Sequence, residues 1–191
     1  MLNNESNYAE IIDFLEGMTN RQIRDYNTLE LLPMNTVMSI LNENLDDSIK
    51  LWSQSLPNTS ISPIRGIGTQ TQSIDKLNLR FKVFNIIGFG FSDGSELSIC
   101  SDGSNGLEIV SFKIANDKKG LGLDKLVFEL FLSFCLKSIL YIPSILITLK
   151  QNHPHYNSVL DFFVKFDFQK IRVEDGIVTL RKKVKYFSSE D

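Results

Sequence analysis

The sequence predicts a mixed α/β fold of the α+β type, with a mixed, mostly antiparallel central sheet flanked by helices and a helical N-terminal segment. Three observations predict it. Apolar residues recur at helical spacing before residue 56. From Leu77 onward they alternate with polar residues, and turn sequences separate the runs. Long apolar segments then interrupt the strands, so the expected order after the N-terminal helices is βββ-α-β-α-ββ.

The 191 residues are 42% hydrophobic and 23% charged, which fits one domain over residues 1–191. A net charge of -3 gives no electrostatic reason to expect strong nucleic-acid binding. The two cysteines, Cys100 and Cys135, lie in apolar runs, which is typical of reduced core thiols and favours a cytoplasmic protein. The most apolar stretch, 126–147, is interrupted by charged residues and a proline, so we expect no membrane span.

Residues 1–55 are expected to hold two or three helices. Thr36, after Pro33, is a candidate helix start, and the polar run 42–47 is expected to divide two short helices. The next segment, 56–76, is rich in Ser, Thr, Asn, Gly and Pro and is predicted to be mainly loop, with one short strand near Ile64.

Residues 77–185 are expected to form the core sheet and its helices. Three strands come first as an antiparallel meander, and the remaining elements alternate between helix and strand before a final hairpin. The predicted strands are Leu77–Phe89, Glu96–Ser101, Leu107–Ile114, Ser144–Leu149, Phe168–Val173 and Ile177–Lys183. The predicted helices are Leu123–Ile139 and His155–Phe166.

The third strand runs through Gly120 and Gly122 directly into a helix. Glycines at a helix start leave backbone N–H groups open, and the helix N-terminus adds partial positive charge, so the loop suits a pyrophosphate. Lys118 and Lys119 would add cations over the same anion. The alternative is a tight strand-to-helix turn without a ligand.

The segment Asp117-Lys118-Lys119-Gly120-Leu121-Gly122-Leu123 resembles the pyrophosphate motif of the GNAT acetyl-CoA-dependent N-acetyltransferases, which lies at the turn from their fourth strand into their third helix. The resemblance covers about 77–184 and implies a GNAT-like fold with acetyl-CoA as the acyl-donor substrate and no metal. It assigns cofactor contacts to Phe112, Lys113, Ile114, Lys118, Lys119, Gly120, Leu121, Gly122, Leu123, Asn152 and Phe163.

Three positions depart from the family pattern. Asp117 stands where the family prefers Arg or Gln, so Lys118 or Lys119 would have to make the phosphate contact. Phe163 stands where a Tyr usually protonates the departing thiolate, and Asp167 replaces a Gly. These departures leave open a second interpretation, a GNAT-fold binding or regulatory module without turnover.

Acyl transfer from a thioester to an amine needs a neutral amine, stabilisation of an oxyanion, and a proton for the thiolate. By resemblance to the histone-acetyltransferase branch, Glu108 is the candidate base; the alternative is a solvated Glu at a strand start. The backbone N–H of Phe112 or Lys113 could polarise the carbonyl. Tyr156, seven residues before Phe163 and so on the same helix face, is the candidate acid; the alternative is an ordinary residue at a helix start.

The partners implied are acetyl-CoA and a primary amine of a small molecule, peptide or protein, and a homodimer is left open. His153 and His155 have no Cys pair or carboxylate cluster nearby in sequence, so we expect no metal site. Residues 1–60 carry nine acids and three bases, a net -6, whereas 61–191 carry fourteen acids and seventeen bases, a net +3. This division suits a phosphate-bearing ligand on the second part and an amine on the first.

Overall fold

The computed structural model describes residues 34–56, 59–73, 79–101, 106–138 and 144–183. Its helices are α2 (Met34–Ser55), the 3₁₀ helix η1 (Asn116–Lys118), α3 (Leu123–Ser138) and α4 (Tyr156–Lys165). Its strands are β1 (Ile61–Ser73), β2 (Leu79–Phe91), β3 (Glu96–Ser101), β4 (Gly106–Lys113), β5 (Ser144–Lys150), β6 (Gln169–Glu174) and β7 (Ile177–Lys183).

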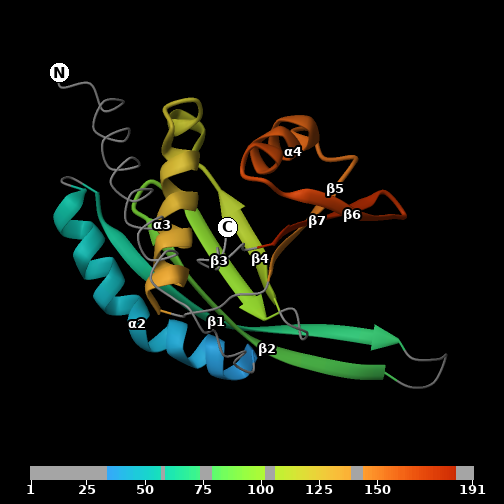
Figure 1. Cartoon of the computed structure of the whole chain (residues 1–191), viewed down its shortest axis with the longest axis horizontal. Coiled ribbons are helices and arrows are strands. Elements are labelled where there is room, and N and C mark those ends of the chain that lie inside the picture. The colour runs from blue at the N-terminus through green and yellow to red at the C-terminus, as the bar shows by residue number, and fades with distance from the viewer. Residues whose placement is uncertain (1–33, 57–58, 74–78, 102–105, 139–143, 184–191) are drawn as a thin grey trace, which may run out of the picture.

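All seven strands form one sheet in the order β1-β2-β3-β4-β5-β7-β6. Only β4 and β5 pair in parallel, joined by the crossover through α3, and every other neighbouring pair is antiparallel. Helices α2 and α3 lie side by side over the β1–β3 part of the sheet, while α4 lies beside its β5–β7 part (Figure 1). The predicted mixed, mostly antiparallel sheet flanked by helices is therefore confirmed.

Helix α2 is one continuous helix, so the predicted break at 42–47 is wrong. Its apolar residues lie three or four positions apart and are buried as one stripe that spans the polar run: Val37, Met38, Leu41, Leu45, Ile49 and Trp52. The polar side chains of Asn42, Asp46 and Asp47 lie on the exposed face between these positions. The helical period therefore continues through the run that was expected to end it. Residues 1–33, where further helices were predicted, lie outside the described part.

Strand β1 replaces most of the loop predicted for 56–76. It has 13 residues, and its pairing with β2 runs from Ile61 opposite Phe91 to Ser73 opposite Leu79. Because β1 is an edge strand with mostly exposed side chains, it lacks the apolar alternation by which strands are recognised. Backbone hydrogen bonding to β2 stabilises it instead. The two strands extend beyond the rest of the sheet as a ribbon (Figure 1).

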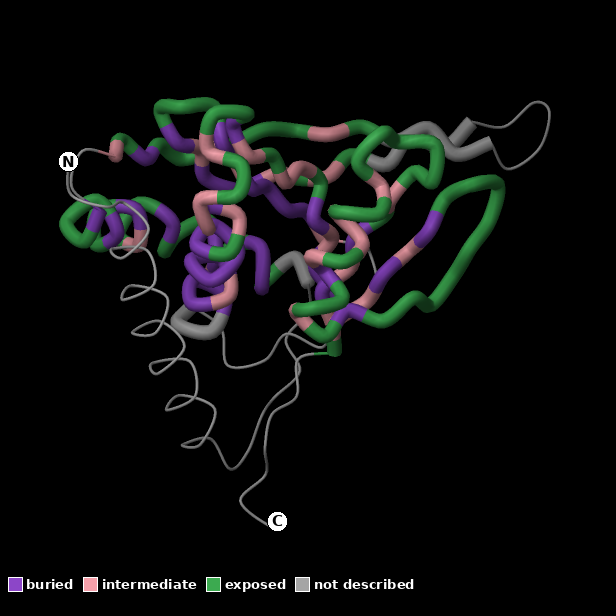
Figure 2. Tube along the Cα trace, turned by 90° about the horizontal axis from the view of Figure 1, so that it is seen from above, coloured by how far each residue is buried: buried purple, intermediate pink, exposed green. Residues whose placement is uncertain are grey.

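The other elements follow the predicted order. The β2–β3–β4 meander and the later strands and helices lie within a few residues of their predicted bounds. A row of buried aliphatic residues in register crosses the sheet: Ile87, Ile99, Ile109, Ile147 and Leu180. The predicted core phenylalanines of α3, Phe128, Phe131 and Phe134, are at most 2% exposed. Figure 2 shows this buried interior between the helices and the sheet.

Candidate functional site

The sheet divides between β4 and β5. Their parallel pairing starts at Gly106 opposite Ser144 and ends at Ile109 opposite Ile147. Beyond this point β4 continues against β3 and β5 continues against β7. The last residues of β4 therefore leave one side of their backbone without a strand neighbour, and alternate N–H groups there point toward the gap.

A β-bulge lies where the two strands separate. Ser98 is opposite Ser111 whereas Ile99 is opposite Ile109, so Val110 is an extra residue in β4. A bulge bends its strand and increases the local twist, and such bulges are frequent next to active sites. The Val110 side chain is 47% exposed. The bulge thus bends β4 at the position where it leaves β5.

Two adjacent cavities occupy the resulting opening. A cleft of about 320 Å³ lies between the strands and is lined by residues of β4 and β5 together with His153, Tyr156, Val159 and Phe163. A wider cavity of about 510 Å³ lies over the end of β4, between the first turn of α3 and α4. Phe112, His153 and Val159 line both cavities. The two spaces can therefore hold consecutive parts of one extended ligand.

The glycine loop borders the wide cavity. Gly120 and Gly122 have φ of 78° and 79°, in the left-handed region that favours glycine, and a Cβ at either would meet no atom within 4 Å. Gly122 also starts α3, because its carbonyl accepts the Leu126 N–H at 3.1 Å. The glycines thus set the backbone path of the loop and leave open space beside it.

The structure distinguishes between the two lysines of the loop. Lys119 lines the wide cavity, whereas the Lys118 ammonium lies 4.0 Å from the carboxylate of Asp117. Lys119 is therefore the lysine positioned to meet a bound anion. Asp124, in the first turn of α3, also lines the cavity. It is the one acidic residue among the described residues that line it.

The walls of the wide cavity combine two chemistries. Its apolar residues are Phe112, Ile114, Val159 and Phe162, and its polar side chains are Lys113, Asn116, Lys119, Asp124, His153, His155 and Ser158. An apolar surface with a polar rim that holds two lysines and one carboxylate suits a ligand that joins an uncharged arm to phosphates. Open space at the glycines, backbone N–H groups and a lysine together fit a diphosphate.

The proposed acid and base lie in different places. Tyr156 lines the cleft at the start of α4, near Phe163, which is fully buried among the aromatic side chains Phe112, Phe128 and Phe168. Glu108 is half-buried on β4, opposite Leu146, and lines neither of the two cavities. Adjacent residues of a strand point to opposite faces of the sheet. The Glu108 side chain therefore points to the face opposite the one that carries Ile109 and the helices.

The predicted cofactor residues are brought together only in part. Phe112, Lys113, Ile114, Lys119 and Gly120 line the wide cavity, and Phe163 lines the cleft. Lys118, Leu121, Gly122, Leu123 and Asn152 are near in sequence but line neither cavity. Sequence reasoning missed Val110, Asn116, Asp124, Thr148, Ser158 and Phe162, and it considered the two histidines only as metal ligands.

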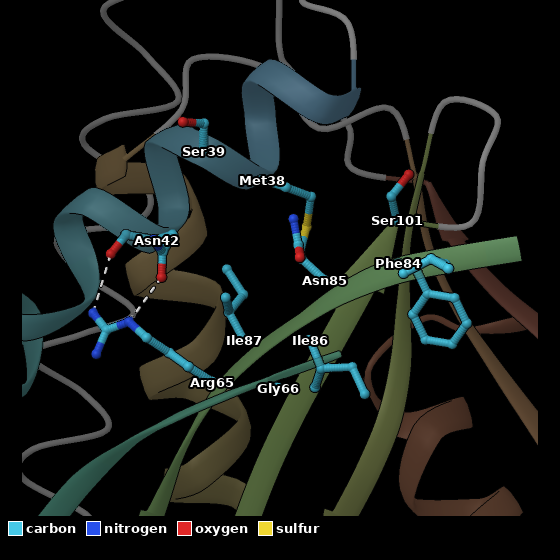
Figure 3. Close-up of a pocket in the computed structure, with 11 residues that line it drawn as sticks. Met38, Ser39, Asn42, Arg65, Gly66, Phe84, Asn85, Ile86, Ile87 and Ser101 are labelled. Atoms are coloured by element: carbon cyan, nitrogen blue, oxygen red, sulfur yellow. Dashed lines mark hydrogen bonds between the residues drawn. The ribbon is translucent and has the colours of Figure 1, made fainter. Parts of the chain in front are cut away.

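A third cavity, of about 500 Å³, lies between α2 and the β1–β2 ribbon (Figure 3). Arg65 lines this cavity, and its guanidinium group donates hydrogen bonds to Asn42 and Asp46 at 2.8 to 3.3 Å. Ile87 lines this third cavity, and Ile147 lines the cleft. The buried residues Ile99 and Ile109 lie between them in the register of the sheet. The third cavity is therefore separate from the β4–β5 opening.

The buried thiols take no part in the site. Cys100 and Cys135 are both buried, and neither forms a disulfide, as the sequence predicted. Burial raises the pKa of the Cys135 thiol well above its ordinary value, which keeps it protonated. Within the described residues, no group of three or more His, Cys, Asp or Glu side chains could hold a metal ion. None of the described helices has the length and apolar character needed to span a membrane.

Comparisons with known proteins give weak similarities. No family model and no curated protein matches the chain. A protein from Pyrococcus horikoshii is similar at 16% identity over 52% of this chain and 65% of that chain, with a TM-score of 0.40. A candidate streptothricin acetyltransferase from Bacillus anthracis, solved with acetyl coenzyme A, is similar at 10% identity over 74% of this chain and 95% of that one, with a TM-score of 0.42.

A GNAT-family acetyltransferase from Listeria monocytogenes is similar at 14% identity, over 52% of this chain and 64% of that chain, with a TM-score of 0.36. This chain thus spans about two thirds of the length of two of the proteins. Because these TM-scores are below 0.5, we assign neither a family nor an activity to this chain from these similarities. The fold class itself follows from the strand order: it is the mixed, mostly antiparallel sheet flanked by helices that the sequence predicts, with the glycine loop between β4 and α3.

Proposed function

We propose that this protein is a cytoplasmic acetyl-CoA-dependent N-acetyltransferase that transfers an acyl group to a primary amine of a small molecule, peptide or protein. The observation that carries the proposal is the opening of the sheet between β4 and β5, which leads into a cavity bordered by Lys119 and Gly120. When bound, acetyl-CoA supplies the acyl group as a thioester.

Residues of the opening have separate roles in binding. Lys119 and the backbone of the glycine loop bind the diphosphate, while Phe112 and Val159 contact the uncharged arm that passes from the wide cavity into the cleft. The Phe112 or Lys113 N–H donates to the thioester carbonyl and stabilises the oxyanion that develops there.

Two side chains move protons. Glu108 accepts a proton from the attacking ammonium or amine, and its position implies that the acceptor approaches from the sheet face opposite Ile109. The amine nitrogen forms a bond to the acyl carbon as the carbon–sulfur bond breaks. Tyr156, in the cleft, gives a proton to the departing thiolate in place of the residue that Phe163 has replaced.

Isothermal titration of the full chain with acetyl-CoA and CoA tests the binding step. Lys119→Glu is expected to weaken binding by roughly tenfold or more, because it replaces an attraction to phosphate with a repulsion. Lys183→Glu is the matched control, since Lys183 is exposed and pairs with Ser144 at the far end of β5. Absence of binding of both ligands to folded protein would contradict the proposal.

Turnover is measured as thioester-dependent acylation over a panel of primary amines. Glu108→Gln is expected to lower turnover by about 100-fold while leaving CoA affinity unchanged, as expected for loss of a general base. Binding of acetyl-CoA without acylation of any amine would instead favour the alternative of a regulatory or binding module.

A further inference from the structure

The turn between β5 and α4 places two histidines on the wide cavity. His153 and His155 are both exposed, and their ring centroids lie 5.8 Å apart. Both line the cavity, as do Lys119 and Gly120 of the glycine loop. None of the roles proposed above for binding or catalysis uses these imidazoles.

The two rings are not equivalent. The backbone N–H of His155 donates to Nδ1 of His153 at 3.2 Å, so a neutral His153 carries its proton on Nε2 and presents a donor there. His155 is the N-cap residue of α4, and its side chain makes no capping hydrogen bond. Its ring can therefore take up a proton without losing a bond to the helix.

The charges around the cavity favour an anion between its walls. Lys113 comes from β4, Lys119 and Asp124 come from the loop and first turn of α3, and Lys150 and Tyr156 line the adjacent cleft. Protonation of His155 would add a cation on the α4 wall to the two lysines on the other walls, whereas the described residues that line this cavity include one carboxylate, that of Asp124. An imidazole changes charge between about pH 5 and pH 8.

We propose that His155, with His153 as a neutral donor beside it, binds a phosphate of the ligand's nucleotide end, so that affinity rises as the pH falls. This inference rests on the proposed function. It concerns the phosphates alone, and it assigns the histidines no contact with the uncharged arm or the reacting thioester.

The experiment is isothermal titration of the full chain with CoA, 3′-dephospho-CoA and pantetheine, at about pH 6 and about pH 8. The 3′-phosphate itself gains a proton near pH 6, and dephospho-CoA removes that contribution. For the unmodified chain we expect dephospho-CoA to bind about threefold to tenfold more tightly at the lower pH. His155→Gln should abolish the increase, while Lys165→Gln, at the other end of α4, should keep it.

Pantetheine, which lacks the phosphates, should bind equally at both pH values and to all variants. If His155→Gln affects CoA but not dephospho-CoA, the phosphate concerned is the 3′-phosphate, which also supports the inference. CoA binding that is unchanged by His155→Gln at both pH values would overturn it and leave the proposed function standing. Failure of CoA and pantetheine alike to bind folded protein would overturn both. Thermal unfolding of each variant checks its fold.

Discussion

Asp167 lies in the left-handed region at the end of α4, with a φ of 64°. The Phe168 N–H donates to the Phe163 carbonyl and the Asp167 N–H to the Val164 carbonyl, which is the Schellman pattern of a helix end. That position favours glycine, the residue found there in the family that the sequence resembles. Among the described residues, Asp167 forms an ion pair with Lys182 at 3.7 Å, which offsets part of this cost.

Asp167→Gly is therefore expected to raise the free energy of unfolding by about 0.5 to 1 kcal/mol, because glycine adopts this conformation without a Cβ penalty. Asp167→Ala is the matched comparison: it keeps the Cβ and loses the ion pair, so it should lower stability slightly. Urea unfolding of the three proteins measures both changes. A stability of the glycine variant at or below that of the alanine variant would contradict the prediction.

Cys135 should make the fold sensitive to alkaline pH. Burial raises its thiol pKa in the native state, whereas the unfolded thiol ionises near pH 8.5. The contribution of this thiol to the free energy of unfolding is therefore complete below about pH 8.5 and falls as the pH rises toward the native pKa. Between pH 8 and pH 10, urea midpoints should fall more steeply for the unmodified chain than for Cys135→Val.

Tyr156 provides a test of the cleft at the level of one hydroxyl. Tyr156→Phe should lower turnover by about tenfold to 100-fold with little change in CoA affinity, because the ring stays and only the proton donor is lost. Steady-state kinetics and titration separate the two effects. Equal turnover of the two proteins would remove Tyr156 as the acid.

At the scale of elements, the sequence predicted most of the fold because most elements carry local periodicity. Helix α3 is recognisable from its apolar run, and β3 from the turn sequences that flank it. Two short helices were predicted in place of α2 because the polar run 42–47 is typical of a helix end. The buried apolar stripe of α2 nevertheless continues through this run at Leu45. The short strand predicted near Ile64 lies within β1, but the full length of β1 was not predicted because its stability comes from pairing with β2, and no pattern within the strand indicates that pairing.

The candidate site was predictable only where it is local. The glycine loop and its lysines are consecutive in sequence, so their proximity needs no tertiary information. The opening between β4 and β5 depends on where a parallel pairing stops and on the bulge at Val110, both of which are set by distant strands. For the same reason, the approach of His155 and Phe162 to the loop could not be predicted.

The glycine loop makes a prediction at this scale. Gly120→Ala and Gly122→Ala should each cost about 1 kcal/mol of stability, since both glycines have left-handed φ angles, and each should weaken CoA binding several-fold by redirecting the loop N–H groups.

Gly94→Ala is the control for that experiment. Gly94, in the turn between β2 and β3, has a φ of 89° and equally open surroundings, so it should lose similar stability without a change in CoA affinity. Titration alongside thermal unfolding compares the three variants. Equal effects on CoA affinity at all three positions would mean that the loop has no specific role.

At the scale of the whole molecule, the sheet behaves as two parts joined by a short parallel pairing. β1 to β4 form one part and β5 to β7 the other, and among the described residues only 106–109 and 144–147 connect them by strand pairing. A ligand in the opening would contact both parts, so it should stabilise the native state by mass action, by about 2.7 kcal/mol at 100 times its Kd.

A crystal structure of the full chain with acetyl-CoA is the most direct test of the central claim. The account predicts the diphosphate against Gly120 and Lys119, and the acylated arm between β4 and β5 beyond the Ile109–Ile147 pair. Acetyl-CoA bound instead in the cavity beside Arg65, or an empty opening in crystals grown at saturating acetyl-CoA, would contradict it.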